Sequence, residues 1–129
     1  MIILLSDDLM DASKTIASAR ALGANVVSFK TLSAAIDRLN QNDVACCIVD
    51  LQFPGLDVGQ FVTALGALKK RTKIIAYGSH VDALRLKQAR EAGCDLVLPR
   101  SAYFERMPSE IAYWAGQSPS NKLTERIDD

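Results

Sequence analysis

Residues 44–57 read Val44-Ala-Cys-Cys-Ile-Val-Asp50 and then Leu51-Gln-Phe-Pro-Gly-Leu-Asp57. The first seven residues form a short aliphatic run that ends in an acid, which is typical of a buried strand followed by a loop. A second run, Met1-Ile-Ile-Leu-Leu5, opens the chain and leads into Asp7 and Asp8. Two strands should therefore deliver three carboxylates to one edge of a sheet, where open α/β folds bind ligands.

Short aliphatic runs alternate with helical patterns along the whole chain. Strands are predicted at residues 2–5, 25–29, 44–49, 73–77 and 96–98. Apolar residues three and four positions apart predict helices between them. This alternation indicates a doubly wound α/β domain, in which helices cover both faces of a five-stranded parallel sheet. Because proline suits the first turn of a helix, Pro108 predicts a last helix over 108–115, preceded by a short turn at 101–105.

Composition and charge limit the class of protein. The 129 residues are 49% apolar and 23% charged, which fits one globular domain, expected over residues 1–115, with a polar tail or linker at 116–129. Fifteen basic residues balance fifteen acidic ones, so no net charge favours nucleic acid or an anionic membrane. No apolar stretch approaches the roughly 20 residues that span a bilayer, and no signal peptide is recognisable. We expect a cytoplasmic protein that binds neither nucleic acid nor membranes.

The three carboxylates predict a cation site. Two carboxylates about 4 Å apart repel by about 4 kcal/mol at an effective dielectric constant of 20, so a third carboxylate favours a hard divalent ion such as Mg²⁺. Such an ion would also screen Asp50 while a phosphorus centre approaches, so that the carboxylate could form an acyl phosphate. The simpler interpretation is structural: Asp7 or Asp8 would cap the first helix, and Asp50 would be a turn residue.

Residues 1 to about 115 resemble the receiver domains of response regulators in two-component phosphorelays. The resemblance is carried by Asp7-Asp8, by Asp50 with residues 51–57, and by the segment 92–95, Ala-Gly-Cys-Asp. It implies a flavodoxin-like fold with strand order 2-1-3-4-5. It also implies that Asp50 is the phosphoacceptor, that Asp8 and Asp50 bind Mg²⁺ directly, that Asp7 acts through a water, and that Gln52 contributes its backbone carbonyl.

The same resemblance exposes departures at the switch positions of the family. Receivers carry Ser or Thr at the end of strand four, where this chain has Tyr77, and an aromatic residue in strand five, where it has Leu96. The family lysine at the end of strand five is replaced by Pro99, or by Leu98 if the prolines are matched. Arg100 lies one residue further, and an adjacent strand position would point it to the opposite face.

We therefore expect a receiver-like signalling domain without enzymatic activity. It would act as a protein-interaction module with an acidic pocket and a degenerate phosphorylation switch. The expected partner is a histidine kinase or an output protein, bound through the fourth helix, the fifth strand and the last helix, a surface that could also form a homodimer. Of Tyr113 and Trp114 on the last helix, one ring should be exposed for such contacts.

Two alternatives remain open at this point. In the first, the domain is phosphorylation-competent and receives a phosphoryl group from a histidine kinase on Asp50. In the second, it is a small ligand-binding or hydrolytic α/β domain. Against the second alternative, the sequence has no glycine-rich phosphate loop, no G-x-S-x-G elbow and no paired catalytic histidine.

Overall fold

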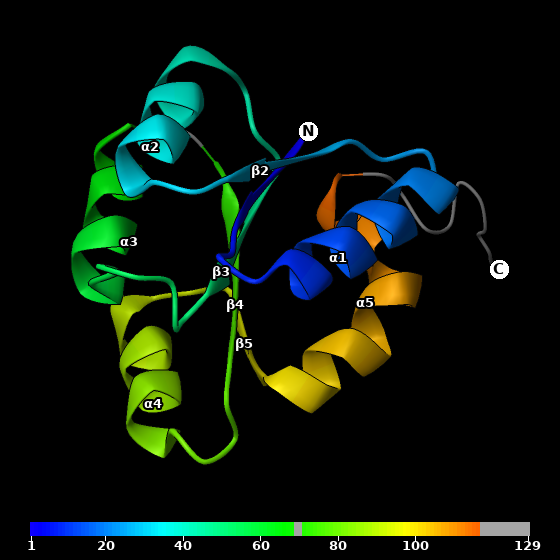
Figure 1. Cartoon of the computed structure of the whole chain (residues 1–129). Helices are drawn as coiled ribbons and strands as arrows, with labels where there is room; N and C mark the ends of the chain where they lie inside the picture. Colours follow the sequence, from blue (N-terminus) through cyan, green and yellow to red (C-terminus); the bar gives the residue numbers. More distant parts are fainter. Residues whose placement is uncertain (69–70, 117–129) are drawn as a thin grey trace, which may run out of the picture.

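Strands and helices alternate along the chain in the computed structural model, which describes residues 1–68 and 71–116 (Figure 1). The elements are β1 (Ile2–Leu5), α1 (Leu9–Ala21), β2 (Val26–Phe29), α2 (Leu32–Gln41), β3 (Cys46–Asp50), α3 (Val58–Ala67), β4 (Lys73–Gly78), α4 (Ala83–Ala92), β5 (Leu96–Pro99) and α5 (Arg100–Trp114). The five predicted strands are all present, with ends that differ by up to two residues.

The strands form one parallel sheet in the order β2-β1-β3-β4-β5. Helices α1 and α5 lie on one face of the sheet, and α2, α3 and α4 lie on the other (Figure 1). The predicted fold class, doubly wound and flavodoxin-like, is confirmed. Because β1 and β3 are neighbours, their carboxyl ends open at the same edge of the sheet, and the loops that carry Asp8 and Asp50 begin there.

The two faces of β1 and β3 contribute to two separate cores, and a smaller third cluster lies between β4 and α4. Successive side chains of a strand point to opposite faces, so one short aliphatic run can serve both cores. Ile48 packs with the residues of α5, whereas Cys47 and Val49 pack with those of α2 and α3. Asp50 follows Ile48 by two positions and therefore faces α1 and α5. Its register partner on β4 is Tyr77, which shares that face.

The prediction for the last helix is wrong. Helix α5 is continuous from Arg100 to Trp114, with Pro108 inside it rather than at its start. Four large side chains, Tyr103, Met107, Ile111 and Trp114, recur at helical spacing and are buried against the sheet. Pro108 is exposed on the opposite side. Tertiary packing of this apolar stripe outweighs the local preference of proline for a helix start.

The predicted boundary of the domain falls at the edge of the described residues. Helix α5 ends at Trp114, and the predicted tail, 116–129, lies outside the described part of the chain apart from Gly116. None of the helices in residues 1–68 and 71–116 combines the length and hydrophobicity that a membrane span requires.

Candidate functional site

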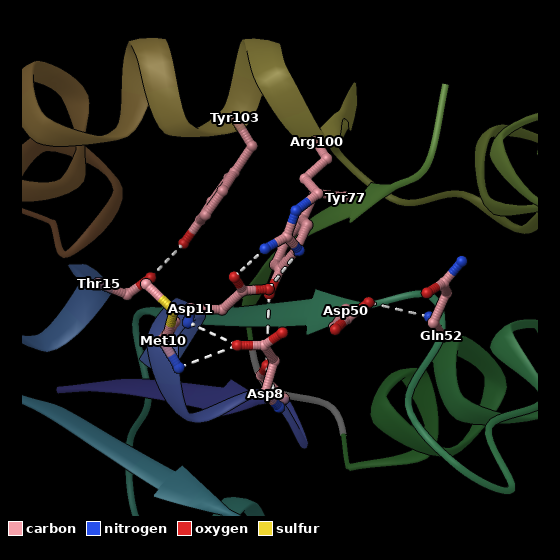
Figure 2. A network of polar contacts seen from close by, with 10 residues as sticks. Asp8, Met10, Asp11, Thr15, Asp50, Gln52, Tyr77, Arg100 and Tyr103 are labelled. Carbon is pink, nitrogen blue, oxygen red and sulfur yellow. Dashed lines mark hydrogen bonds and ion pairs between the residues drawn. The ribbon is translucent and has the colours of Figure 1, made fainter. Parts of the chain in front are cut away.

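Asp50 is the last residue of β3 and is 8% exposed, although it is a charged residue (Figure 2). Its Oδ1 accepts a hydrogen bond of 3.0 Å from the backbone N–H of Gln52. Burial raises the pKa of the Asp50 carboxyl above its ordinary range, while the Gln52 N–H opposes that rise. The negative charges of Asp11 and Asp8 raise the pKa further, and the positive charge of Arg100 lowers it.

Asp8 caps helix α1. Its Oδ1 accepts hydrogen bonds from the backbone N–H groups of Met10, at 2.9 Å, and Asp11, at 3.0 Å (Figure 2). This is the structural role that the sequence offered as the simpler interpretation. Oδ2 of Asp8 forms no hydrogen bond with the described residues. Asp7 is exposed and has no hydrogen bond or ion pair within the described part of the chain.

Tyr77 occupies the end of β4 beside Asp50 and is fully buried. Its phenol oxygen lies 3.0 Å from Oδ2 of Asp11 and 3.4 Å from Oγ of Ser6. Its ring stacks on Tyr103 with 4.3 Å between the ring centroids and 11° between the planes. Burial raises the pKa of the Tyr77 phenol, so the hydroxyl keeps its proton and donates a hydrogen bond to the Asp11 carboxylate.

Asp11 and Arg100 form an ion pair beside this ring that sequence reasoning missed. Two guanidinium nitrogens of Arg100 bind the two carboxylate oxygens of Asp11, which has no exposed surface (Figure 2). The expectation that Arg100 points to the opposite face is wrong. Arg100 is not part of β5 but the first residue of α5, so the strand alternation does not apply to it. We call Asp11, Tyr77 and Arg100 the Asp11 cluster.

Asp11 was missed because it lies on an unexpected face of its helix. The first apolar residue of α1, Leu9, is 71% exposed, whereas the buried residues of the helix are Asp11, Thr15 and Ala19. Thr15 is also used in a polar contact, because its hydroxyl lies 2.9 Å from that of Tyr103. The available signal was the four-residue spacing of Asp11, Thr15 and Ala19.

The remaining switch positions lie on β5 and at its end. Leu96 is partly buried and packs against the same core as Tyr77. Leu98 is the register partner of Tyr77, and Pro99 caps α5 without a side-chain hydrogen bond. None of these three side chains carries a charge. In the Asp11 cluster, the positive charge is supplied by Arg100, which also lies over the ring of Phe104, 5.1 Å from its centroid.

Two carboxylates at this edge of the sheet have no positively charged partner of their own in the described part of the chain. Arg100 neutralises Asp11, which leaves Asp8 and Asp50 as two carboxylates, each with one oxygen that has no hydrogen bond from the described residues. Carboxylate oxygens are the ligands that Mg²⁺ prefers. Nevertheless, no three His, Cys, Asp or Glu side chains in residues 1–68 and 71–116 are grouped so that they could hold a metal ion.

Comparisons with known proteins point in one direction. Residues 3–112 match the family described as the response regulator receiver domain. Similar solved structures include the beryllofluoride-activated NtrC4 receiver domain dimer, with 17% identity, a TM-score of 0.76, and coverage of 89% of this chain and 95% of that one. The receiver domain of the sensor histidine kinase PA1611 from Pseudomonas aeruginosa, with magnesium in its active site cleft, has 19% identity, a TM-score of 0.75, and coverage of 90% and 97%.

A third similar structure, full-length FixJ from B. japonicum, has 22% identity and a TM-score of 0.77, with coverage of 94% of this chain and 60% of that one. No curated protein sequence matches the chain. At these identities the solved structures establish the fold, whereas the match over residues 3–112 establishes the family.

Proposed function

Because the chain belongs to the response regulator receiver domain family, a family of signalling modules, we propose that it is a two-component signalling domain whose phosphorylation switch is degenerate. It would act by binding another protein rather than by catalysis, in the cytoplasm. The observation that carries this proposal is the environment of Tyr77, which is fully buried, hydrogen-bonded to Asp11 and stacked on Tyr103.

A switch at this position requires a group that moves toward a phosphoryl group on Asp50. The Tyr77 hydroxyl is instead bound to a buried carboxylate, and its ring is enclosed by Tyr103 and by the edge of Phe104. Moving the hydroxyl would leave Asp11 with one donor fewer and would open a cavity in a packed core, and both changes are unfavourable. A phosphoryl group would therefore not select a second conformation of β4.

The surface proposed for partner binding is formed by α4, β5 and α5. Val81, in the loop before α4, is 78% exposed, and Leu84, at the start of α4, is 64% exposed. Tyr113 on α5 is 53% exposed, while its neighbour Trp114 is buried. Exposed large apolar side chains of this kind favour protein contacts. A histidine kinase, an output protein or a second copy of the chain would fit this surface.

Magnesium is proposed as a weak ligand of the acidic pocket. Asp8 and Asp50 would bind it directly, Asp7 through a water, and Gln52 through its backbone carbonyl, as the family pattern implies. The two uncompensated carboxylates support this proposal. The ion would screen Asp50 from an approaching anion.

The alternative function, a phosphorylation-competent receiver with Asp50 as the acceptor, is favoured by one observation. Arg100 places a positive charge close enough to Asp50 to lower the pKa of its carboxyl. An arginine can bind phosphoryl oxygens in place of the missing lysine. The other alternative, a hydrolytic or small-ligand-binding domain, loses its support through the family membership.

Beryllium fluoride with Mg²⁺ distinguishes a degenerate switch from a phosphorylation-competent one, because its adduct mimics a phosphoryl group on an aspartate. We expect amide resonances to change at the loop that follows Asp50 and to stay in place at residues 75–79 and 96–103. Asp50→Asn serves as the control, because it removes the attachment point. Shifts at 75–79 and 96–103 that depend on Asp50 would show a working switch and reject the degenerate reading.

A further inference from the structure

Two carboxylates, Asp11 and Asp50, lie in the neighbourhood of the Arg100 guanidinium. Both carboxylates are buried, and Arg100 binds both oxygens of Asp11 but forms no hydrogen bond with Asp50. Figure 2 shows the guanidinium of Arg100 directed at Asp11, with Asp50 beyond it on β3. A single guanidinium is therefore available to two acids, and one of them holds it.

The geometry favours Asp11 in this competition. Arg100 binds both oxygens of Asp11 in a bidentate arrangement, which is the strongest pairing that the two groups can form. The side chain of Asp11 has no exposed surface, so in this structure its charge is compensated by Arg100 and by the Tyr77 hydroxyl rather than by water. Although the Arg100 side chain is 45% exposed, its departure would leave the buried Asp11 carboxylate without a cationic partner, which is unfavourable. Arg100 should consequently remain on Asp11 when an anion occupies Asp50.

We propose that Asp11 is a positioning residue that withholds Arg100 from Asp50 and thereby determines that the pocket binds phosphoryl-like anions weakly. This inference rests on the proposed function, because it explains why Arg100, whose charge acts on Asp50, does not replace the missing lysine. The weak binding of phosphoryl-like anions would therefore depend on Asp11 in α1 and not on the length or type of the side chain at position 100.

The test compares two variants that both lack the charge of Asp11. Asp11→Asn keeps a similar shape and retains an oxygen that can accept the hydrogen bond of Tyr77, but it no longer neutralises Arg100. The double variant Asp11→Asn with Arg100→Gln removes both charges of the pair, which avoids leaving either one uncompensated. Affinity for beryllium fluoride is measured by calorimetry at fixed Mg²⁺ concentration, and melting curves establish that both variants are folded.

We expect Asp11→Asn to bind beryllium fluoride about 10- to 100-fold more tightly than the double variant, the range that a hydrogen bond to a charged group typically contributes. Both variants lack the negative charge of Asp11, so both lose its repulsion of the bound anion to the same extent. The difference in affinity therefore reports on Arg100 alone. Equal affinities would overturn the inference and leave the proposed function standing. The proposed function fails separately, if the parent protein shows Asp50-dependent shifts at 75–79.

A measurement on the parent protein keeps the inference testable if Asp11→Asn does not fold. Rotation of a guanidinium held by two hydrogen bonds is slow, so the terminal N–H groups of Arg100 should give separate NMR resonances. The exposed Arg20 is the reference for a guanidinium that rotates freely. Averaged resonances for Arg100, similar to those of Arg20, would show that Asp11 does not hold it and would overturn the inference.

Discussion

Opposing influences act on the buried Asp50 carboxyl group. Burial and the charges of Asp11 and Asp8 favour its protonated form, whereas the Gln52 N–H and Arg100 favour the ionised form. The net effect raises its pKa, so ionised Asp50 is less stable in the fold than in the unfolded chain. The residue that is best placed for chemistry is therefore also a source of instability.

Asp50→Asn should raise the melting temperature in metal-free buffer at neutral pH. The asparagine oxygen can still accept a hydrogen bond from the Gln52 N–H, but the buried negative charge is removed. Each kcal/mol of relief corresponds to about 4 °C for a domain of this size. Because the folded-state pKa lies above the unfolded value of about 3.9, the gain should be full above the folded-state pKa and absent below the unfolded one.

Differential scanning calorimetry between pH 3 and pH 8 measures this dependence. The control is Asp37→Asn, which alters an exposed acid on α2 and should leave the melting temperature within about 1–2 °C of the parent. A lower melting temperature for Asp50→Asn at neutral pH would mean that the Asp50 charge has a stabilising partner.

The three tyrosine hydroxyls provide a graded test of the Asp11 cluster. Tyr77→Phe removes a buried hydrogen bond to a carboxylate and should cost about 1.5–3 kcal/mol of unfolding free energy. Tyr103→Phe removes a bond to the neutral Thr15 hydroxyl and should cost about 1 kcal/mol. Tyr113→Phe changes an exposed ring and should cost about 0–0.5 kcal/mol. Urea unfolding gives all three values, and an equal cost for Tyr77→Phe and Tyr113→Phe would contradict the cluster.

At the scale of elements, the sequence predicted the strands and helices that are marked by a local pattern of apolar residues. The aliphatic runs of β1, β3 and β4 indicated buried strands, and their parallel order followed from the alternation with helices. Helix α5 was mispredicted because proline is a strong local signal, whereas the stripe from Tyr103 to Trp114 acts only through the sheet it packs on. Arg100 was misplaced for the same reason, since its direction depends on where α5 begins.

The site shows the same division between local and tertiary information. Asp8 and Asp50 were found because each follows an aliphatic run. The spacing of Asp11, Thr15 and Ala19 could have indicated that Asp11 is buried, but its role depends on Tyr77 and Arg100, which are 66 and 89 residues away in the chain. No local pattern relates three such positions. Whether Asp8 and Asp50 bind a metal stays a prediction.

Helix α5 offers a direct prediction about its proline. Pro108 has no N–H to donate inside the helix, and its side chain is exposed. Pro108→Ala should restore a helical hydrogen bond, but it also gives the unfolded chain more conformational freedom, which opposes the gain. The net increase in the unfolding free energy should be about 1–3 kcal/mol. Guanidinium unfolding measures the change, and Ser109→Ala, also on the exposed side, is the control. A loss of stability in Pro108→Ala would show that this proline is compensated by its surroundings.

At the scale of the whole molecule, the topology brings β1 and β3 together so that their loops meet at one edge. The balanced total charge conceals a local imbalance there, because Arg100 neutralises Asp11 and leaves Asp8 and Asp50. A ligand that binds only the folded state stabilises the entire domain through mass action. A weak metal site at this edge should therefore be measurable in global unfolding, whatever its effect on signalling.

Mg²⁺ should raise the melting temperature of the parent protein, with a gain of about 1.4 kcal/mol at ten times the dissociation constant. Asp8→Asn should abolish this gain while it preserves the helix, because asparagine caps a helix about as well as aspartate. The Asp50→Asn variant should also show no rise in melting temperature with Mg²⁺, although its melting temperature without metal should be higher than that of the parent. Asp37→Asn should respond to Mg²⁺ as the parent does. Sodium chloride at equal ionic strength separates specific binding from screening. An unchanged response in Asp8→Asn would place any bound cation elsewhere and would reject the pair Asp8 and Asp50 as its ligands.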